Sequence, residues 1–315
     1  MIDLLYCFDE NYNVQAFLSI KSFIQHNDTQ ININIIHKNP DTFLEYSEEI
    51  VGIKNVNLEI KKFENKNNLP LLINDAHYSE ATYYRIFLED YLGSELENVL
   101  YLDPDIICLN DIQNEFKTLC KKLNDKDLVL AAKTDGVEKD APELFRKLNM
   151  KKKYFNAGVM FINLRKWRSI NLTKKLENKI IELGENISLA DQDALNSFFD
   201  GDYLELEEKL NYYADHKADS QLLNYIKKNV FFLHYVGSTK PWTPYGGIDK
   251  ISNFYHQQHL DIYGKYHIVL VHRKNDAIVL LKKIFNLNIF QIEKPVLYII
   301  NFFKVLTKNN KSNIR

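Results

Sequence analysis

Short apolar runs and amphipathic segments alternate along the first part of the chain. The apolar runs at residues 2–8, 31–37 and 58–63 have the length and composition of β-strands. Between them, residues 14–24 and 41–51 carry apolar side chains at helical spacing. This strand–helix–strand order is typical of a mainly parallel sheet with helices packed against it. Ligands of such sheets bind beyond the carboxyl ends of the strands, so we expect a functional site there.

The same alternation continues through the body of the chain. Further strands are expected at residues 99–102 and 128–132, from Phe155 onward and from Phe231 onward. Further helices are expected at residues 81–93, 138–150 and 173–184, and from Ala190 onward. No Gly-x-Gly-x-x-Gly follows the first strand, so the dinucleotide-binding fingerprint is absent. We therefore predict one Rossmann-like α/β domain with a mixed, mainly parallel sheet, followed by a helical tail.

The C-terminal segment differs from the rest of the chain in charge. Residues 272–315 hold nine Lys/Arg and two Asp/Glu, a charge of +7 against −9 for the remainder, which together give the formal −2. Within residues 276–306, apolar residues recur at helical spacing between lysines, with a break at Pro295. The longest wholly apolar run after this proline is residues 296–300, far short of the ~20 residues that a membrane-spanning helix needs.

This basic amphipathic tail has two interpretations. One is a segment that lies on an anionic membrane surface. The other is a helical subdomain packed on the body, or an interface for a partner protein. The pattern supports both. We expect the chain to divide into a body at residues 1–265 and an extension at residues 266–315. Nucleic-acid binding is not expected, because the lysines alternate with long aliphatic residues instead of forming a stripe with stacking aromatics.

Length and composition are those of an ordinary globular protein. The chain has 315 residues, 45% apolar and 26% charged, enough for one large domain with an appendage. Cys7, Cys108 and Cys120 are odd in number and have no metal-binding spacing, so we expect reduced thiols. The first strand follows Met1 without a basic leader, so we expect no signal peptide. These features predict a cytoplasmic protein, peripheral on the inner face of the membrane if the tail binds lipid.

Two acidic residues interrupt the apolar run that begins with the strand at residues 99–102. Asp103 and Asp105 flank Pro104, which favours an extended backbone before it, so both side chains point to one face. Two carboxylates beside a buried strand need compensation, and a divalent cation with oxygen ligands supplies it. The alternative is a turn at the strand end, since Asp and Pro are common turn residues.

Six short motifs stand in the chain in a characteristic order and spacing. They are F-D-E-N-Y at 8–12, Y-Y-R at 83–85, Y-L-D-P-D at 101–105, F-N-A-G-V at 155–159, D-Q-D at 191–193 and H-Y-V-G-S-T-K-P-W at 234–242. Together they resemble glycosyltransferase family 8, which includes bacterial lipopolysaccharide galactosyltransferases and glycogenin, over roughly residues 1–260. The resemblance implies a fold of the GT-A type, a UDP-hexose donor, manganese as cofactor and retention of configuration.

The resemblance also implies which residues bind the metal and the diphosphate. Asp103, Asp105 and His234 match the Mn²⁺ ligands, and carboxylates with imidazole suit such an ion. Because His234 stands in an apolar strand, its alternative role is that of a buried core histidine with hydrogen-bonded ring nitrogens. The Gly237-x-x-Lys240 that follows favours the role of a metal ligand. Lys240 matches the residue that neutralises the phosphate as UDP leaves, and its alternative is a solvated loop lysine.

Three further residues match positions that hold the nucleotide. His77, which precedes Arg85 at the distance seen in the family, is expected to touch the diphosphate. Asp9 and Asn11 match the residues that hold the uracil and the ribose. Their alternative is to cap the helix that begins near Val14, and both roles can coexist.

The resemblance places seven residues around the donor sugar. They are Arg85, Asp135, Asn156, Ala157, Gly158, Asp191 and Gln192. The fork of Arg85 serves either sugar hydroxyls or the orientation of carboxylates. Gly158 lets the backbone approach the ligand, or it serves strand packing. Asp191 and Gln192 act in catalysis, or they are ordinary first-turn residues of a helix.

Gln192 matches the position that faces the anomeric carbon, where no carboxylate stands as the nucleophile of a double displacement. We therefore predict front-face substitution, in which the acceptor hydroxyl attacks on the side from which UDP leaves. Asp191, Gln192 and Lys240 are the predicted catalytic residues. Pro104 departs from the aliphatic residue of the best-known members, but that middle side chain does not bind the metal.

The predicted function is transfer of galactose or glucose from UDP-hexose to a glycan, glycolipid or glycoprotein acceptor of a bacterial cell surface. The alternative is a UDP-sugar-binding scaffold for other glycosyltransferases. A degenerate scaffold predicts the loss of a metal ligand, and Asp103, Asp105 and His234 are all present.

Overall fold

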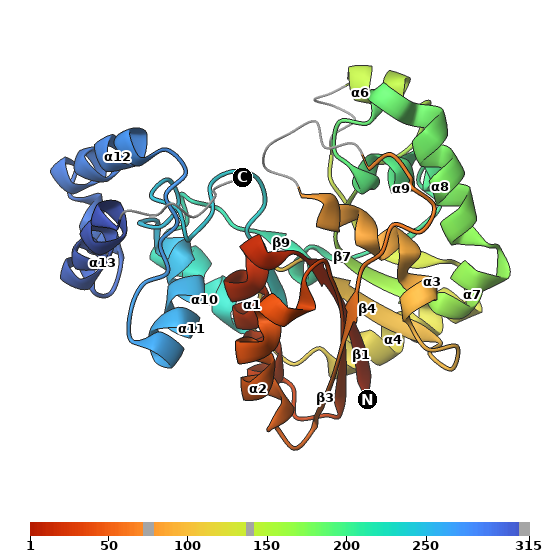
Figure 1. Ribbon diagram of the computed structural model, residues 1–315, viewed down its shortest axis with the longest axis horizontal. Helices are drawn as coiled ribbons and strands as arrows, with labels where there is room; N and C mark the ends of the chain where they lie inside the picture. The colour runs from red at the N-terminus through yellow and green to blue at the C-terminus, as the bar shows by residue number, and fades with distance from the viewer. Residues whose placement is uncertain (72–78, 137–141, 309–315) are drawn as a thin grey trace. The chain divides into compact units, whose positions relative to one another are not determined.

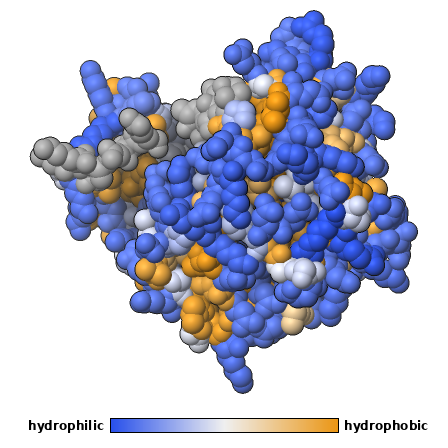
Figure 2. All heavy atoms as spheres, turned by 45° about the vertical axis from the view of Figure 1, so that its right-hand side comes forward, coloured by the Kyte–Doolittle hydropathy of each residue, from blue (hydrophilic) through white to orange (hydrophobic). Residues whose placement is uncertain are grey.

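The computed structural model describes residues 1–71, 79–136 and 142–308, and the chain forms two compact units. The first unit consists of Met1–Pro104 and Asp111–Asn211, and the second consists of Asp105–Asn110 and Tyr212–Arg315. On the face drawn in Figure 2, hydrophilic side chains predominate and smaller hydrophobic patches lie between them. Exposed apolar groups are normal on the surface of a folded protein, because there is too little polar surface to cover it.

A seven-stranded sheet forms the centre of the first unit, in the order β3-β2-β1-β4-β7-β6-β8 (Figure 1). Its strands are β1 (Ile2–Phe8), β2 (Ile31–His37), β3 (Val56–Lys62), β4 (Asn98–Leu102), β6 (Leu130–Thr134), β7 (Phe155–Asn163) and β8 (Leu204–Glu205). Neighbouring strands are parallel, except that β7 runs antiparallel to both β4 and β6. The sheet is therefore mixed and mainly parallel, which confirms the predicted fold class.

Helices connect these strands and cover the sheet. The described α-helices of the first unit are α1 (Asn13–His26), α2 (Leu44–Val51), α3 (Leu88–Tyr91), α4 (Gln113–Asp125), α6 (Pro142–Lys147), α7 (Leu164–Ser169), α8 (Leu172–Leu183) and α9 (Asp191–Phe199). The described 3-10 helices are η1 (Glu10–Tyr12), η2 (Pro40–Phe43), η3 (Glu80–Phe87), η4 (Gly184–Asn186) and η5 (Glu208–Leu210). The helix expected at residues 81–93 is thus mostly a 3-10 helix, and the helices α4 and α7 were not expected.

Helices α1 and α4 pack on one face of the sheet. The hydroxyl of Tyr6 in β1 lies 3.1 Å from that of Ser19 in α1. The ring of Phe161 in β7 lies 6.1 Å from the ring of Phe116 in α4. Because side chains alternate between the faces of a strand, these contacts identify the face that α1 and α4 cover.

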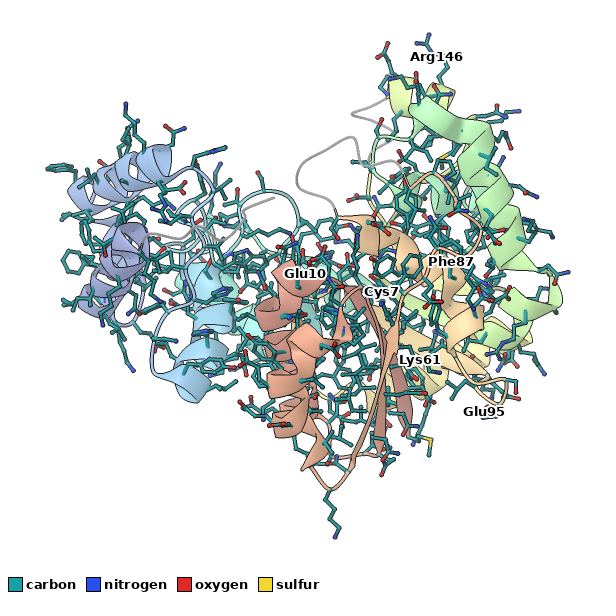
Figure 3. The ribbon with its side chains drawn as sticks, in the orientation of Figure 1. Cys7, Glu10, Lys61, Phe87, Glu95 and Arg146 are labelled. Atoms are coloured by element: carbon teal, nitrogen blue, oxygen red, sulfur yellow. The ribbon has the colours of Figure 1, made fainter. Side chains whose placement is uncertain are left out.

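The opposite face carries the larger buried core of the first unit. Tyr101 of β4 and Met160 of β7 are in register on this face. They share one buried cluster with Trp167 of α7 and with residues of α8 and α9. Cys7 of β1 and Phe87 of η3, both labelled in Figure 3, belong to the same cluster. This packing fixes η3 and α9, which carry predicted site residues, against the sheet.

The second unit begins with a three-stranded sheet in the order β5-β10-β9. Its strands are β5 (Ile106–Cys108), β9 (Tyr212–Tyr213) and β10 (Phe232–His234), and its helices are α10 (Ser220–Asn229), η6 (Lys250–Ser252), α11 (Asn253–Tyr263), α12 (Arg273–Phe285), η7 (Asn288–Gln291) and α13 (Pro295–Thr307). Strand β10 is antiparallel to β5 and parallel to β9. The short strand β5 therefore brings the chain just after the D-x-D motif beside the strand that ends at His234.

The tail helices α12 and α13 pack into a core of their own unit. Leu280 of α12 and Tyr298 and Phe302 of α13 are buried in one cluster with Ile248 and Leu260. The tail therefore forms part of a helical subdomain, one of the two predicted alternatives. Among the described residues, no helix combines the length and apolarity needed to cross a membrane.

Candidate active site

The predicted site residues form two clusters, one within each unit, and Arg85 of η3 is the centre of the first. The residue is 4% exposed. Its Nε and Nη2 donate to the two oxygens of Asp191 at 2.5 and 3.0 Å, a bidentate ion pair. Its Nη1 donates to Asp103 Oδ1 at 3.0 Å and to the Ala157 carbonyl at 2.9 Å. One buried cation therefore holds together residues from four of the six motifs.

Burial and neighbouring charges set the ionisation of this cluster. Burial alone would lower the pKa of Arg85, but Asp191 and Asp103 help to raise it well above its usual value. Tyr101 donates its hydroxyl to Asp103 Oδ1 at 2.5 Å, and its ring lies 4.7 Å from the Arg85 guanidinium. Burial raises the pKa of Tyr101 well above its usual value, so the phenol stays a donor. The sequence analysis missed Tyr101, although a residue two positions before Asp103 on a strand shares its face.

The start of α9 positions the D-Q-D motif. Asp191 and Asp193 lie in the first turn of α9. The motif therefore also fits the alternative expectation of ordinary first-turn residues, because acidic side chains are favoured at the start of a helix. Gln192 Oε1 accepts the Ala157 N–H at 2.8 Å, and its Nε2 donates to the Tyr154 hydroxyl at 3.2 Å. The side chain of Gln192 is therefore held against the F-N-A-G-V strand.

Hydrogen bonds orient the amide of Asn156. Its Oδ1 accepts the Gly158 N–H at 3.0 Å and Nδ2 of Asn211 at 3.0 Å. The Asn211 carbonyl in turn accepts from Lys133 Nζ at 3.1 Å. Two donors on Oδ1 fix the orientation of the amide and leave its NH₂ end for a ligand acceptor. Gly158 also pairs with the neighbouring strand, since its carbonyl accepts the Asp103 N–H at 2.8 Å.

The remaining predicted residues of the first unit lie near strand ends. Asp9 directly follows β1, and its Oδ1 accepts the Asn11 N–H at 3.0 Å as the cap of η1. Asp9 therefore has a capping role on η1, whereas the helix expected near Val14 has Tyr12 as its N-cap without a side-chain hydrogen bond, and Asn11 lies within η1. Asp135 follows β6, where its N–H donates to the Tyr154 carbonyl at 2.8 Å. His77 lies outside the described residues.

The second cluster is centred on Asp105, directly before β5. Lys240 Nζ donates to Asp105 Oδ2 at 2.5 Å and to the Tyr235 carbonyl at 2.5 Å. His234 Nε2 lies 3.2 Å from Asp105 Oδ1. Burial raises the pKa of Asp105, but Lys240 and His234 lower it more, so the net shift is downward. Gly237 has φ of +72°, a left-handed conformation that favours glycine and lets the chain turn between His234 and Lys240.

The donor set around Asp105 fits a divalent cation. Asp105 Oδ1 is buried, and the polar group beside it is His234 Nε2 at 3.2 Å, which does not meet the geometry of a hydrogen bond. A cation bound by this oxygen and by the imidazole would satisfy both groups. The adjacent imidazole of His234 is a ligand for borderline transition metals. Asp103 is linked to Asp105 through Pro104 alone, which limits the distance between their Cα atoms to about 7 Å.

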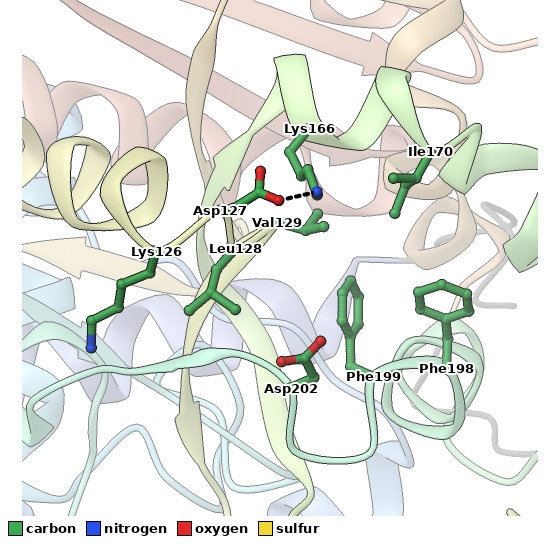
Figure 4. A pocket seen from close by; sticks show the side chains of 9 residues that line it. All are labelled: Lys126, Asp127, Leu128, Val129, Lys166, Ile170, Phe198, Phe199 and Asp202. Atoms are coloured by element: carbon green, nitrogen blue, oxygen red, sulfur yellow. Dashed lines mark hydrogen bonds and ion pairs between the residues drawn. The ribbon is translucent and has the colours of Figure 1, made fainter.

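A separate pocket in the first unit has a volume of ≈ 510 Å³ (Figure 4). Its walls are formed by Lys126, Asp127, Leu128, Val129, Lys166, Ile170, Phe198, Phe199 and Asp202. These residues lie before β6 and after β7, whereas Asp135 follows β6 and Asn156 lies near the start of β7. None of the predicted site residues that the structure describes lines this pocket.

Solved structures with the same fold are glycosyltransferases. The galactosyltransferase LgtC, in complex with donor and acceptor sugar analogues, superposes with a TM-score of 0.62 and 24% identity, covering 76% of this chain and 89% of that one. The apo form of GlyE from Streptococcus pneumoniae TIGR4 superposes with a TM-score of 0.62 and 21% identity, covering 91% of this chain and 64% of that one. The fold is therefore the GT-A type of glycosyltransferases.

The sequence comparisons show the family. The sequence model of glycosyl transferase family 8 matches residues 3–245. The lipopolysaccharide 1,2-glucosyltransferase of Escherichia coli is 30% identical over 261 residues, which cover 78% of this chain and 76% of that protein. The lipopolysaccharide 1,3-galactosyltransferase of Salmonella typhimurium is 29% identical over 182 residues, which cover 56% of this chain and 54% of that protein. The chain belongs to glycosyl transferase family 8, which confirms the resemblance seen in the six motifs.

Proposed function

We propose that this protein transfers galactose or glucose from UDP-hexose to a hydroxyl of a bacterial cell-surface glycan, glycolipid or glycoprotein, with Mn²⁺ as cofactor and retention of configuration. The observation that carries the proposal is the cluster of Asp105, His234 and Lys240 in a family 8 chain. It offers carboxylate and imidazole ligands for a cation beside an ammonium group for a phosphate. The proposal includes both galactose and glucose as donor sugars, since the relatives named above include a glucosyltransferase and a galactosyltransferase.

Asp103, Asp105 and His234 are the proposed Mn²⁺ ligands. When bound, the ion neutralises charge on the diphosphate and stabilises the departing UDP. Lys240, which follows the turn at Gly237, adds a second positive charge for the leaving group. His77 is assigned to the diphosphate by the resemblance alone, and Asp9 and Asn11 are assigned to the uracil and the ribose in the same way.

The proposed donor-sugar site belongs to the first unit. Its residues are Arg85, Asp135, Asn156, Ala157, Gly158, Asp191 and Gln192. Both oxygens of Asp191 accept from the Arg85 guanidinium, so this carboxylate is a poor nucleophile. Gln192 carries no charge. These two facts support substitution on one face of the sugar over a covalent glycosyl–enzyme intermediate.

In the proposed reaction the bond between the anomeric carbon and the phosphate oxygen breaks as the acceptor oxygen approaches on the same face. The electron pair of that bond leaves with UDP, and the proton of the acceptor hydroxyl passes to the leaving phosphate. Gln192 holds the sugar in place, Asp191 holds Arg85 through its ion pair, and Lys240 stabilises the phosphate charge. Inverted anomeric configuration in the product would contradict this mechanism.

The direct test is UDP release from a panel of UDP-sugars, measured with Mn²⁺ and again with excess chelator. We expect release from UDP-galactose or UDP-glucose, its loss on chelation, and its loss in Asp105→Ala. The control variant is Asp249→Ala, because Asp249 also pairs with a lysine in the second unit but lies outside the six motifs. The scaffold alternative predicts UDP-sugar binding without turnover, even with mixed acceptor glycans present.

The C-terminal extension at residues 266–315 is the proposed membrane contact of a catalytic domain at residues 1–265. Phe285 at the end of α12, Leu287 before η7 and Phe290 in η7 are 81%, 68% and 71% exposed. The lysines of α12 and α13 lie on the same basic segment. Aromatic side chains next to lysines favour the interface of an anionic membrane. The proposed location is therefore the cytoplasmic face of the cell membrane.

The exposed aromatic residues allow a test that keeps the core of the subdomain intact. We expect the Phe285→Ser/Phe290→Ser variant to lose sedimentation with vesicles of anionic phospholipid while it retains UDP release. The control is Val51→Ser, because Val51 is 63% exposed but lies in the first unit. Unchanged sedimentation of the double variant would contradict the membrane contact.

A further inference from the structure

Lys240 lies on the same carboxylate that the proposed cation requires. Its Nζ is 2.5 Å from Asp105 Oδ2 and 2.5 Å from the Tyr235 carbonyl, and the side chains of Lys240 and Asp105 are only 15% and 12% exposed. His234 faces the other oxygen of the carboxylate at 3.2 Å. In this arrangement an ammonium group neutralises Asp105 at the position where a metal ion is expected.

We infer that Lys240 and the divalent cation compete for Asp105, so that binding of the cation releases Lys240 to the diphosphate of the donor. The inference rests on the proposed function and adds an order of assembly to it. Lys240 thus has two alternative partners, first a carboxylate and then a phosphate.

The chemistry of the groups supports such an exchange. A lysine ammonium is a compact charge on a flexible stem, so it changes partner without a change of backbone. Two cations close to one carboxylate repel each other, and a nearby phosphate removes this repulsion by accepting the ammonium. Gly237, with φ of +72°, gives the connecting loop its turn.

The competition predicts that Lys240→Met strengthens the binding of Mn²⁺ and weakens the binding of UDP. Lys240→Met removes the ammonium, whose Nζ lies 5.9 Å from the centroid of the Trp242 ring, and keeps the stem. An opposite charge within about 4–6 Å of a carboxylate changes its proton affinity by about ten- to a thousandfold. We therefore expect Lys240→Met to bind Mn²⁺ alone at least about tenfold more tightly than the unmodified protein. The same variant is expected to bind UDP more weakly in the presence of Mn²⁺.

Lys283 provides a matched control within the same unit. Its Nζ also donates to a backbone carbonyl, that of Tyr245, at 2.5 Å and to a carboxylate, that of Asp249, at 3.0 Å. The side chains of Lys283 and Asp249 are each 18% exposed, close to the values of the Lys240 pair. Lys283→Met therefore removes an equivalent charge pair away from the proposed ligands, and Mn²⁺ affinity is expected to stay unchanged.

The experiment is a titration of the full chain with MnCl₂, followed by the electron paramagnetic resonance signal of free Mn²⁺, without nucleotide. Tighter binding by Lys240→Met but not by Lys283→Met supports the competition. Equal or weaker binding by Lys240→Met overturns it, as does equal tightening in both variants. If none of the proteins binds Mn²⁺, the metal part of the proposed function fails and the competition fails with it.

A second titration separates this inference from the proposed function. In the unmodified protein, Mn²⁺ is expected to tighten UDP binding by at least about tenfold, because the ion takes the place of Lys240 on Asp105 and leaves its ammonium to the diphosphate. UDP then tightens Mn²⁺ binding by the same factor, because coupling between two sites is reciprocal. In Lys240→Met this coupling is expected to fall severalfold. If the coupling persists unchanged in Lys240→Met while the unmodified protein releases UDP from its donor, the exchange of Lys240 is refuted but the proposed enzyme is not.

Discussion

The substitution Arg85→Met removes the cation at the centre of the first cluster and leaves an unbranched apolar side chain in its place. Four hydrogen bonds are lost, two to Asp191, one to Asp103 and one to the Ala157 carbonyl. Asp191 is 0% exposed, so its carboxylate stays buried without its counter-ion. The variant therefore measures how strongly the first unit depends on this ion pair.

The expected loss follows from the burial of the pair. Removing one partner of a buried ion pair costs about 3–5 kcal/mol of the free energy of unfolding. For a domain of this size, each kcal/mol lowers the unfolding midpoint by roughly 2–4 °C, so a decrease of about 6–20 °C is expected. A domain stability above about 6 kcal/mol, within the usual range of about 5–15 kcal/mol, leaves the variant folded at low temperature.

A second substitution tests the reason for this loss. In Arg85→Met/Asp191→Asn the unpaired charge becomes a neutral amide, whose unsatisfied groups cost about 1–3 kcal/mol, less than a buried charge. We expect the double variant to be more stable than Arg85→Met by roughly 1–2 kcal/mol in urea unfolding followed by circular dichroism. A double variant no more stable than Arg85→Met would refute the reasoning, because an orphaned charge at Asp191 could not then be the main cost.

Two further predictions concern protonation and the orientation of an amide. Burial lowers the pKa of His256 to about 4 and that of His267 to about 3, from 6.5. As the pH falls, the histidines of the unfolded chain are protonated before those of the folded chain. The free energy of unfolding of the second unit is therefore highest above about pH 6.5, and below this pH each of the two histidines lowers it by roughly 1.4 kcal/mol per pH unit. An unfolding midpoint that is equal at pH 7 and pH 5 would contradict this. Asn211→Ala removes a donor to Asn156 Oδ1, and calorimetry is expected to show several-fold weaker binding of UDP-hexose with unchanged binding of UDP. Equal weakening of both ligands would instead indicate a general loss of structure.

Local signals in the sequence were sufficient for much of the fold. Strands β1 and β2 have their predicted bounds, and Pro295 begins α13 at the predicted break, because strand periodicity and proline effects depend on near neighbours in the chain. Helix α4 was not expected, although its four buried residues stand at the spacing i, i+3, i+4 and i+7 of an amphipathic helix. Strand β5 has three residues, which is too short for a periodic pattern.

The sequence by itself determined the family, the order of the main elements and the identity of the candidate site residues, because all of these are properties of short motifs and local periodicity. Only the tertiary structure decided which of those residues meet. Arg85 reaches Asp191 across 106 positions, and Lys240 reaches Asp105 across 135. Such pairs depend on strand register and on the burial of each partner, which no local pattern contains. For the same reason, only packing against residues such as Leu260 showed that the basic tail forms part of a folded subdomain.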